Sequence, residues 1–229
     1  MTADEQKRAA GEAAVDLVES GMIVGLGTGS TAAAFVRALG IRRLDIQGVA
    51  TSEATADLAR LMRIPLLELG EAPRIDLTID GADEIGPGLA LIKGAGGALL
   101  REKLVWESSA RCVVIAEAAK PVAILGAGAY PLPIEVVAFG HETTFRRIVG
   151  VLTALNLPAQ PRLRIRDGAT FHTDSGNLIY DAVLGGIPDP AALGAALKAV
   201  TGVVEHGLFL GLAKSALIGT DDGVVTIGV

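Results

Sequence analysis

Short aliphatic segments alternate with helix-forming segments along the first half of the chain, and this alternation limits the possible folds more than any other feature. Aliphatic runs of strand length occupy residues 22–26, 47–50, 77–80 and 112–116. Helices are predicted at residues 2–20, 31–39 and 53–62, and again after Gly97. Strands that are separated by helices pair in parallel through crossover connections. The alternation therefore predicts an α/β protein with a Rossmann-like parallel sheet.

The pattern changes at the Pro131-Leu132-Pro133 segment. The elements predicted after it follow the order β-α-β-β-α-β, with one extra short strand in the hairpin: strand 134–137, helix 143–155, strands 162–165 and 178–182, helix 190–200 and strand 203–205. This order is typical of a ferredoxin-like α+β domain. Two last strands, at 216–219 and 224–229, are predicted to return to the first sheet.

These patterns predict two domains of unequal size. We expect a Rossmann-like catalytic domain of residues 1–130 and 206–229 and a smaller ferredoxin-like domain of residues 131–205. Half of the 229 residues are hydrophobic and only 3% are aromatic, which agrees with compact aliphatic cores.

Charge and hydropathy limit the partners and the compartment. A net charge of −6 provides no basic face for a phosphate backbone, so nucleic acid is not expected as a partner. The first 15 residues carry charges where a signal peptide needs an apolar stretch. No segment approaches the roughly 20 apolar residues of a membrane span. We therefore expect a soluble, cytoplasmic protein.

The cysteine and histidine residues give no sign of a metal or of a nucleophile. The single cysteine, Cys112, lies within an apolar run and is predicted to be a buried thiol. The three histidines, at positions 141, 172 and 206, lack the spacing of metal ligands. Neither a metal site nor a Ser-His-Asp triad is expected.

A glycine-rich loop, Gly25 to Thr31, joins the first predicted strand to the second helix. Glycines allow a sharp turn, and the helix N-terminus that follows favours an anion. The loop lacks the third glycine of the dinucleotide fingerprint, because Ser30 stands there, and it lacks the Gly-Lys ending of a Walker loop. It predicts a phosphate site, with a plain strand-to-helix turn as the alternative.

Hydroxyl groups follow the second predicted strand, in the segment Thr51-Ser52-Glu53-Ala54-Thr55. They can contact a ligand at the strand end. Ser52 can equally cap the helix that follows. The sequence leaves both interpretations open.

Carboxylates cluster where the third strand ends, in Asp80-Gly81-Ala82-Asp83-Glu84. Turns containing Asp and Gly are common without any function. However, the carboxyl edge of a parallel sheet is where α/β proteins bind ligands. We therefore predict functional roles for Asp80 and Asp83 and a solvated position for Glu84.

A second glycine-rich turn begins at Lys93 and leads into a helix that carries Glu102. On that helix the neighbours of Glu102 are apolar: Ala98, Leu99, Val105 and Trp106. At about 100° per residue, Arg101 and Lys103 are predicted to point away from this stripe. A carboxylate within an apolar stripe has a raised pKa, which suits a general base. A surface Glu paired with a Lys is the alternative.

Four motifs in order closely resemble the type A family of ribose-5-phosphate isomerases: GLGTGSTA at 25–32, DGADEI at 80–85, KGAGGALLREK at 93–103 and PLPIEV at 131–136. The segments TDSGN at 173–177 and HGLF at 206–209 fit the same family. The resemblance covers essentially the whole chain. It implies interconversion of ribose 5-phosphate and ribulose 5-phosphate in the pentose phosphate pathway, without metal or organic cofactor, by a homodimer.

The resemblance also implies roles for individual residues. Glu102 matches the proton acceptor that works through a cis-enediolate, and Asp80 and Asp83 match aspartates that contact substrate hydroxyls and assist ring opening. Lys93 matches the cation that steadies the enediolate oxygen. The remaining matches are to substrate-binding positions: Lys7, Thr28, Gly29, Ser30, Thr31, Gly81, Ala82, Gly94, Ala95, Gly96 and Lys120. From their own surroundings, Lys7 and Lys120 would be interpreted as surface lysines. Ala95 stands where the family often has glycine.

Two other classes of protein remain as alternatives. A sugar-phosphate hydrolase or deaminase on a related scaffold needs an activated water and usually a further His or Asp near the loop. A non-catalytic sugar-phosphate sensor has no use for a carboxylate in an apolar stripe.

Overall fold

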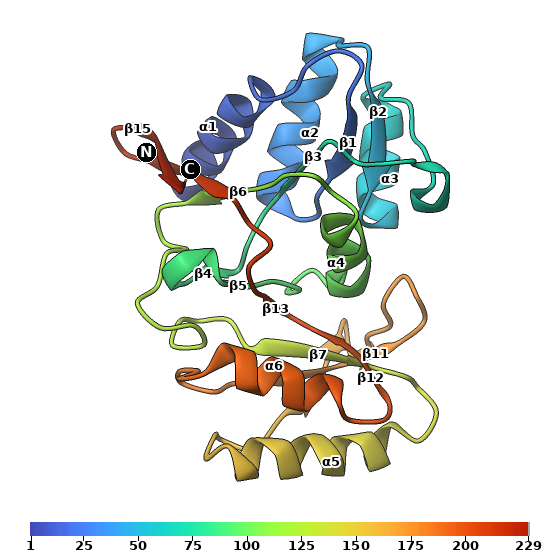
Figure 1. Ribbon diagram of the computed structural model, residues 1–229, viewed down its shortest axis with the longest axis vertical. Helices are drawn as coiled ribbons and strands as arrows, with labels where there is room; N and C mark the ends of the chain where they lie inside the picture. Colours follow the sequence, from blue (N-terminus) through green and yellow to red (C-terminus); the bar gives the residue numbers. More distant parts are fainter. Residues whose placement is uncertain (229) are drawn as a thin grey trace. The chain divides into compact units, whose positions relative to one another are not determined.

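The computed structural model describes residues 1–228, and the chain forms two compact units (Figure 1). The first unit contains Met1–Ala82, Arg101–Lys120 and the described residues from Gly211 onward. The second contains Asp83–Leu100 and Pro121–Leu210. Among the described residues, no helix combines the length and the apolar character needed to cross a membrane.

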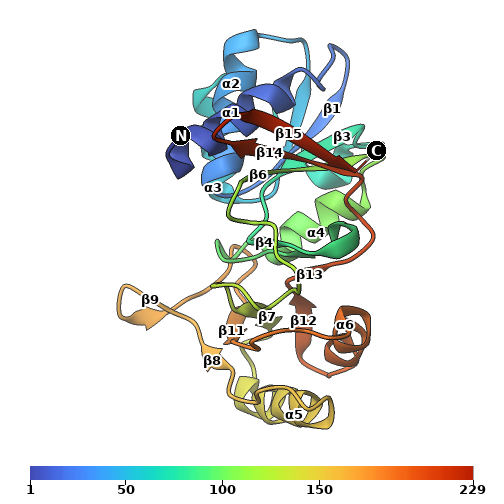
Figure 2. The same cartoon turned by 90° about the vertical axis from the view of Figure 1, so that its left-hand side faces the viewer.

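The first unit is built on a six-stranded sheet with the order β15-β14-β6-β3-β1-β2 (Figure 2). Its strands are β1 (Ile23–Leu26), β2 (Gln47–Ala50), β3 (Leu77–Asp80), β6 (Cys112–Glu117), β14 (Ser215–Thr220) and β15 (Gly223–Gly228). All neighbours pair in parallel except β14 and β15. The Rossmann-like sheet and the return of the tail to it are confirmed. The chain winds outward in both directions from β1, which makes the β1–β3 boundary a topological switch point.

Helices α1 (Ala3–Val15), α2 (Ser30–Arg42) and α3 (Glu53–Leu61) belong to this unit. Helix α4 (Leu99–Glu107) belongs to it from Arg101 onward. Thr2 and Glu5 form the capping box that begins α1, but the helix ends five residues earlier than the predicted Ser20, in a series of turns. Helix α2 passes through Gly40 and ends at Arg42, and the C-cap residue Arg43 has a left-handed backbone.

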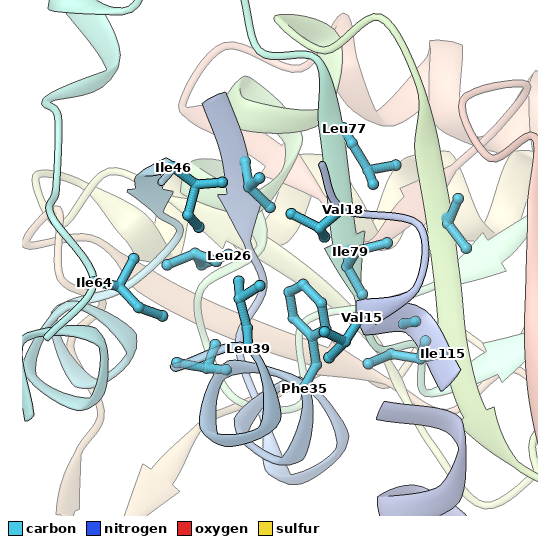
Figure 3. Packing of buried hydrophobic residues seen from close by; sticks show 14 of the residues in the cluster. Val15, Val18, Leu26, Phe35, Leu39, Ile46, Ile64, Leu77, Ile79 and Ile115 are labelled. Atoms are coloured by element: carbon cyan, nitrogen blue, oxygen red, sulfur yellow. The ribbon is translucent and has the colours of Figure 1, made fainter. Parts of the chain in front are cut away.

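Aliphatic side chains fill the space between the sheet and helices α1 and α2 (Figure 3). Phe35 of α2 and Val15 of α1 pack with Leu26, Ile79 and Ile115 from three adjacent strands. On the other face, Val105 of α4 packs with Val49 and Ile75. Because both faces are covered, the strands are apolar along most of their length.

The second unit contains a four-stranded sheet with the order β12-β7-β11-β8, in which every pair is antiparallel. Its elements are β7 (Leu132–Val136), α5 (His141–Ala154), β8 (Arg162–Leu163), β11 (Leu178–Ala182), α6 (Pro190–Lys198) and β12 (Val203–His206). This is the ferredoxin-like topology that the sequence predicts. Ile134 of the sheet, Ile148 of α5 and Leu193 of α6 are each 0% exposed in its core.

The predicted strand 162–165 is interrupted at Arg164. β8 ends at Leu163, and β9 (Ile165–Arg166) pairs with β10 (Ala169–Thr170) in a separate hairpin around the predicted turn at Asp167–Gly168. Figure 2 shows this hairpin extending beyond β8.

The second unit is larger than the predicted ferredoxin-like domain. Strands β4 (Glu84–Ile85), β5 (Leu91–Ile92) and β13 (Leu208–Phe209) form a three-stranded sheet that the sequence did not indicate. Two short 3₁₀ turns, Leu69–Glu71 and Pro87–Leu89, were also missed. Strands of two residues are too short to show a periodicity.

The domain boundaries therefore differ from the prediction. Residues 83–100, 121–130 and 206–210 lie in the second unit rather than in the first. The pairing of β13 with β5, more than 100 positions apart, is what places these segments together. Val229, the end of the predicted last strand, lies outside the described residues.

Candidate active site

The loop that follows β1 runs directly into α2. Gly29 occupies the N-cap of α2, and within the described residues no side chain caps this helix end. Ser30 is exposed and Thr31 is largely buried in the first turn. Backbone N–H groups at an uncapped helix N-terminus favour an anion.

Gly27 allows this loop to approach the end of β3. A Cβ atom on Gly27 would lie 2.1 Å from Asp80 Oδ1 and 2.6 Å from Asp80 Cα. No side chain fits at that distance, so the loop requires glycine here.

Asp80 is 0% exposed and holds the β1 loop in place. Its Oδ1 accepts hydrogen bonds from the backbone N–H of Thr28 (3.1 Å) and of Gly81 (2.7 Å). Its Oδ2 accepts from the indole Nε1 of Trp106 (3.1 Å). Three N–H donors hold this buried carboxylate in one orientation.

Hydroxyl groups from the end of β2 and the start of α3 form hydrogen bonds with the same loop. The Thr28 hydroxyl lies 2.7 Å from Thr51 Oγ1 and 2.8 Å from Ser52 Oγ. Ser52 Oγ accepts from the backbone N–H of Thr55 (3.1 Å) and so caps α3, while the Thr55 hydroxyl donates to Gly27 O (2.9 Å). Of the two open interpretations of this segment, helix capping is confirmed.

Glu102 lies on α4 and is 4% exposed, so the predicted burial of this carboxylate is confirmed. It is four residues before Trp106, which places both side chains on one helix face. Since Trp106 donates to Asp80, that face is turned toward the end of β3. The indole contact was missed, because the sequence showed Trp106 only as an apolar neighbour.

The two basic neighbours of Glu102 differ from each other. Arg101 points away from the stripe, as predicted, and it pairs with Glu53 of α3 at 2.8 Å. Lys103 was expected to point away as well, but it is 7% exposed. All members of the predicted stripe are buried, and Lys103 widens this buried face, while Leu104 is exposed at 46%.

Lys7 and Lys120 lie in one region of the first unit. Gln6, the neighbour of Lys7, accepts through its side-chain oxygen from the backbone N–H of Ala118 (3.2 Å). Lys7 Nζ is 3.3 Å from Asp4, and Lys120 Nζ is 3.6 Å from Glu117. Lys120 is 11% exposed, which is unusual for a surface lysine.

In the second unit, Asp83 is tied to the second glycine-rich turn. Asp83 Oδ2 accepts from the backbone N–H of Ala95 at 2.8 Å. Gly94 and Gly97 have φ angles of +109° and +91°, whereas Ala95 is outside the left-handed region. The alanine at position 95 therefore fits the turn without strain.

Lys93 is 2% exposed and precedes this turn. Its backbone N–H donates to Gly207 O (2.9 Å), and its Nζ lies 5.5 Å from the centre of the Phe209 ring. Strand β13, which the sequence did not reveal, therefore determines where this ammonium lies.

Glu84 is 1% exposed, and the expectation that it is solvated is wrong. Its carboxylate accepts from the backbone N–H of Gly126 (2.6 Å) and of Gly128 (3.0 Å). These donors lie about 40 positions away in sequence, so local patterning did not reveal them.

The predicted site residues are thus distributed over both units. The first unit carries Lys7, Thr28, Gly29, Ser30, Thr31, Asp80, Gly81, Ala82, Glu102 and Lys120, and the second carries Asp83, Lys93, Gly94, Ala95 and Gly96. The chain passes between the units after Ala82, inside the DGADEI motif, and after Leu100, inside the KGAGGALLREK motif.

Burial raises the pKa of the Cys112 thiol to about 12, as expected for a core thiol. Its Sγ donates to Trp106 O at 3.4 Å. Within residues 1–228, no three His, Cys, Asp or Glu side chains are grouped as metal ligands.

Comparisons with known proteins identify the family. The family model for ribose 5-phosphate isomerase A (phosphoriboisomerase A) matches residues 47–223. A relative from Caulobacter sp. (strain K31), named ribose-5-phosphate isomerase A, is 63% identical over 227 residues and 99% of each chain is covered. This chain belongs to the ribose 5-phosphate isomerase A family.

Solved structures agree with that assignment. Ribose 5-phosphate isomerase from Plasmodium falciparum is 37% identical, with a TM-score of 0.92 and 99% of each chain covered. A D-ribose-5-phosphate isomerase in complex with phospho-erythronic acid is 35% identical, with a TM-score of 0.91 over both whole chains. As a member of this family, the enzyme is an aldose–ketose isomerase that interconverts ribose 5-phosphate and ribulose 5-phosphate. The hydrolase, deaminase and sensor alternatives are thereby set aside.

Proposed function

We propose that Glu102 is the base that moves a proton between C1 and C2 of the open-chain sugar. The observation that carries this proposal is its position: a carboxylate that is 4% exposed, on the helix face that also bears Trp106. A carboxylate held in a dry, fixed position is suited to removing a carbon-bound proton.

In the aldose-to-ketose direction, Glu102 takes the proton from C2. The electron pair of the C2–H bond forms the C1=C2 double bond, and the C1 carbonyl oxygen becomes the enediolate oxyanion. A proton passes from the C2 hydroxyl to this C1 oxygen, and Glu102 returns its own proton to C1. The product is the ketose, and the carboxylate is regenerated.

Charge develops on oxygen in this step, and we assign its stabilisation to the Lys93 ammonium and the backbone N–H groups of Gly94, Ala95 and Gly96. Preorganised donors act most strongly where water is excluded. The 2% exposure of Lys93 and the fixed φ angles of the turn support this role.

The two aspartates receive different roles. Asp83 is partly exposed and is held by Ala95 N–H, so we assign proton transfer in ring opening to it. Asp80 is fully buried with both oxygens accepting hydrogen bonds, so we assign it the positioning of the β1 loop.

We place the phosphate group at the N-terminus of α2, with Lys7 and Lys120 as countercharges. The uncapped helix end and the 11% exposure of Lys120 support this placement. The remaining contacts with substrate are assigned to Thr28, Gly29, Ser30, Thr31, Gly81 and Ala82. Phospho-erythronic acid, found in the related structure, is a sugar acid phosphate whose planar carboxylate resembles an enediolate, and we expect it to inhibit this enzyme.

We further propose that the enzyme is a homodimer that acts in the cytoplasm. Family membership supports the dimer, and the exposed apolar side chains of Phe139 (95%) and Val183 (73%) are candidates for its interface. Light scattering on the purified protein measures the oligomeric state, and cell fractionation measures the compartment.

The proposed base is tested by Glu102→Gln, which keeps the shape of the side chain and removes its basicity. We expect kcat to fall by about 10²- to 10⁴-fold, with KM little changed. Exchange of substrate hydrogen with D₂O at C1 and C2 should be lost in parallel. Glu107→Gln, on the exposed side of the same helix, is the matched control. A Glu102→Gln variant that keeps more than about a tenth of kcat would transfer the role to another group.

A further inference from the structure

Arg164 forms hydrogen bonds with carbonyl groups of the second glycine-rich turn. Its Nη1 donates to Gly94 O at 2.9 Å and to Ala95 O at 3.2 Å. Its Nε and Nη2 form a bidentate ion pair with the Asp181 carboxylate of β11. Arg164 is 9% exposed, so this guanidinium is fixed between a carboxylate and two consecutive peptide groups.

Because the peptide bond is planar, fixing a carbonyl group also fixes the direction of the N–H group of the next residue. In a trans peptide the C=O and the following N–H point in opposite directions, and the described chain has no cis peptide. With Gly94 C=O directed at Arg164, Ala95 N–H points the other way, and it meets Asp83 Oδ2 at 2.8 Å. With Ala95 C=O held in the same way, Gly96 N–H is also directed away from Arg164.

Two neighbours hold the turn in the same position. A Cβ on Gly97 would lie 2.4 Å from the Phe171 ring, so this ring packs directly against the backbone. Arg166 lies over the same ring, with its Cζ 4.1 Å from the ring centre. Arg166 Nη2 also donates to Gly96 O at 3.4 Å, so the β9–β10 hairpin and the Phe171 ring that follows it both support the turn.

We propose that Arg164 is a positioning residue for the isomerisation: it orients the Gly94–Ala95 and Ala95–Gly96 peptide groups so that Asp83 and the Gly96 N–H are presented to the substrate. This inference rests on the role proposed above for the turn. Arg164 acts through its hydrogen bonds to Asp181 and to the carbonyl groups of Gly94 and Ala95. Its positive charge on the carbonyl side also polarises both peptide groups and makes their N–H groups stronger donors.

Geometry explains why arginine is required. One planar guanidinium reaches a carboxylate with two nitrogens and two carbonyls with the third. The ammonium of a lysine is a single point of charge and cannot reproduce this fork. Arg164→Lys should therefore fold normally and lose part of kcat.

The principal test compares Arg164→Met with the double variant Arg164→Met/Asp181→Asn. The single variant leaves a carboxylate without its partner, so it loses stability as well as orientation. The double variant removes that charge, and its Tm should recover toward the wild-type value. We expect both variants to lose about 10²-fold in kcat, as for a small misplacement of catalytic groups, with KM for ribose 5-phosphate changed less than about threefold.

The affinity for an inhibitor distinguishes a positioning role of Arg164 from a purely structural one. Phospho-erythronic acid should lose affinity for both variants in proportion to the loss of kcat, because it depends on the same donors. Arg147→Met, an exposed arginine on α5, is the matched control and should leave kcat, KM and Tm unchanged.

The outcomes separate this inference from the role of the turn. A double variant with wild-type kcat, together with an impaired Lys93→Met, would overturn the role of Arg164. If the methionine variants do not fold, a wild-type kcat in Arg164→Lys has the same meaning. If Lys93→Met is fully active, the role of the turn itself is wrong.

Discussion

At the scale of single residues, three charged side chains with assigned roles are almost completely buried: Asp80 at 0%, Lys93 at 2% and Glu102 at 4% exposed. Burying charged groups is costly unless other groups compensate the lost hydration. For Asp80 that compensation is visible in three N–H donors. Such burial gives each group a fixed position in a medium of low polarity, where its charge acts strongly.

Lys93→Met tests whether the ammonium acts in the transition state. Methionine keeps most of the volume and removes the charge, so folding should be preserved. We expect kcat to fall by about 10²- to 10³-fold with a small change in KM, because the charge matters most when the oxyanion forms. Lys214→Met, at an exposed position, is the control. A variant with higher KM and normal kcat would place Lys93 at the phosphate instead.

Gly27→Ala tests the close approach between the β1 loop and β3. The added methyl meets Asp80 Cα at 2.6 Å, so backbone must shift. We expect a loss of about 1 to 3 kcal/mol in the free energy of unfolding, together with a loss of activity. Gly70→Ala is the comparison, since nothing lies within 4 Å of that Cβ. Equal stability of the two variants in urea denaturation would show that the loop is not constrained by Asp80.

At the scale of secondary-structure elements, the first unit presents its loops at the carboxyl ends of parallel strands. The loop of residues 27–29 follows β1, Gly81 follows β3, and Lys120 comes shortly after β6. A Cβ on Gly81 would be 3.9 Å from Ile115 O of β6 and 4.0 Å from Thr31 Cβ of α2. These three strand ends therefore meet beside the N-terminus of α2, next to the switch point of the sheet.

Lys7→Ala tests the countercharge at this edge. Removal of one positive charge should raise KM for ribose 5-phosphate about tenfold, with kcat nearly unchanged, because phosphate binding is equal in the ground and transition states. Arg8→Ala is the matched control, since Arg8 is 65% exposed on the same helix. Unphosphorylated ribose should be a poor substrate for the wild type. Equal kcat/KM for ribose and its 5-phosphate would contradict the proposed anchor.

At the scale of the whole molecule, the chain crosses between its two units inside the DGADEI and KGAGGALLREK motifs. One crossing separates Ala82 from Asp83, and another lies after the first two residues of α4. Of the residues with proposed roles, Glu102 and Asp80 belong to the first unit, and Lys93 and Asp83 belong to the second.

Catalysis should not require a metal ion. Asp80 uses both carboxylate oxygens to accept from N–H groups, and Asp83 Oδ2 accepts from Ala95 N–H, so these atoms are engaged by donors rather than arranged as ligands. Prolonged dialysis of the wild-type enzyme against EDTA should leave kcat unchanged. A loss that added Mg²⁺ or Zn²⁺ restores would make the aspartates metal ligands.

The sequence by itself determined the elements whose signal is local. Strands β2, β3 and β11 have the predicted bounds, because a short aliphatic run bounded by turn residues is a pattern of near neighbours. The two folds, the buried Glu102 and the family motifs were accessible for the same reason. Only the tertiary structure decided the burial of Glu84, the support of the glycine-rich turn by Arg164, and the short sheet of β4, β5 and β13. Each of these depends on hydrogen bonds between distant positions: 42 residues apart for Glu84 and Gly126, 70 for Arg164 and Gly94, and more than 100 for the pairing of β13 with β5. No local pattern encodes which distant groups will meet.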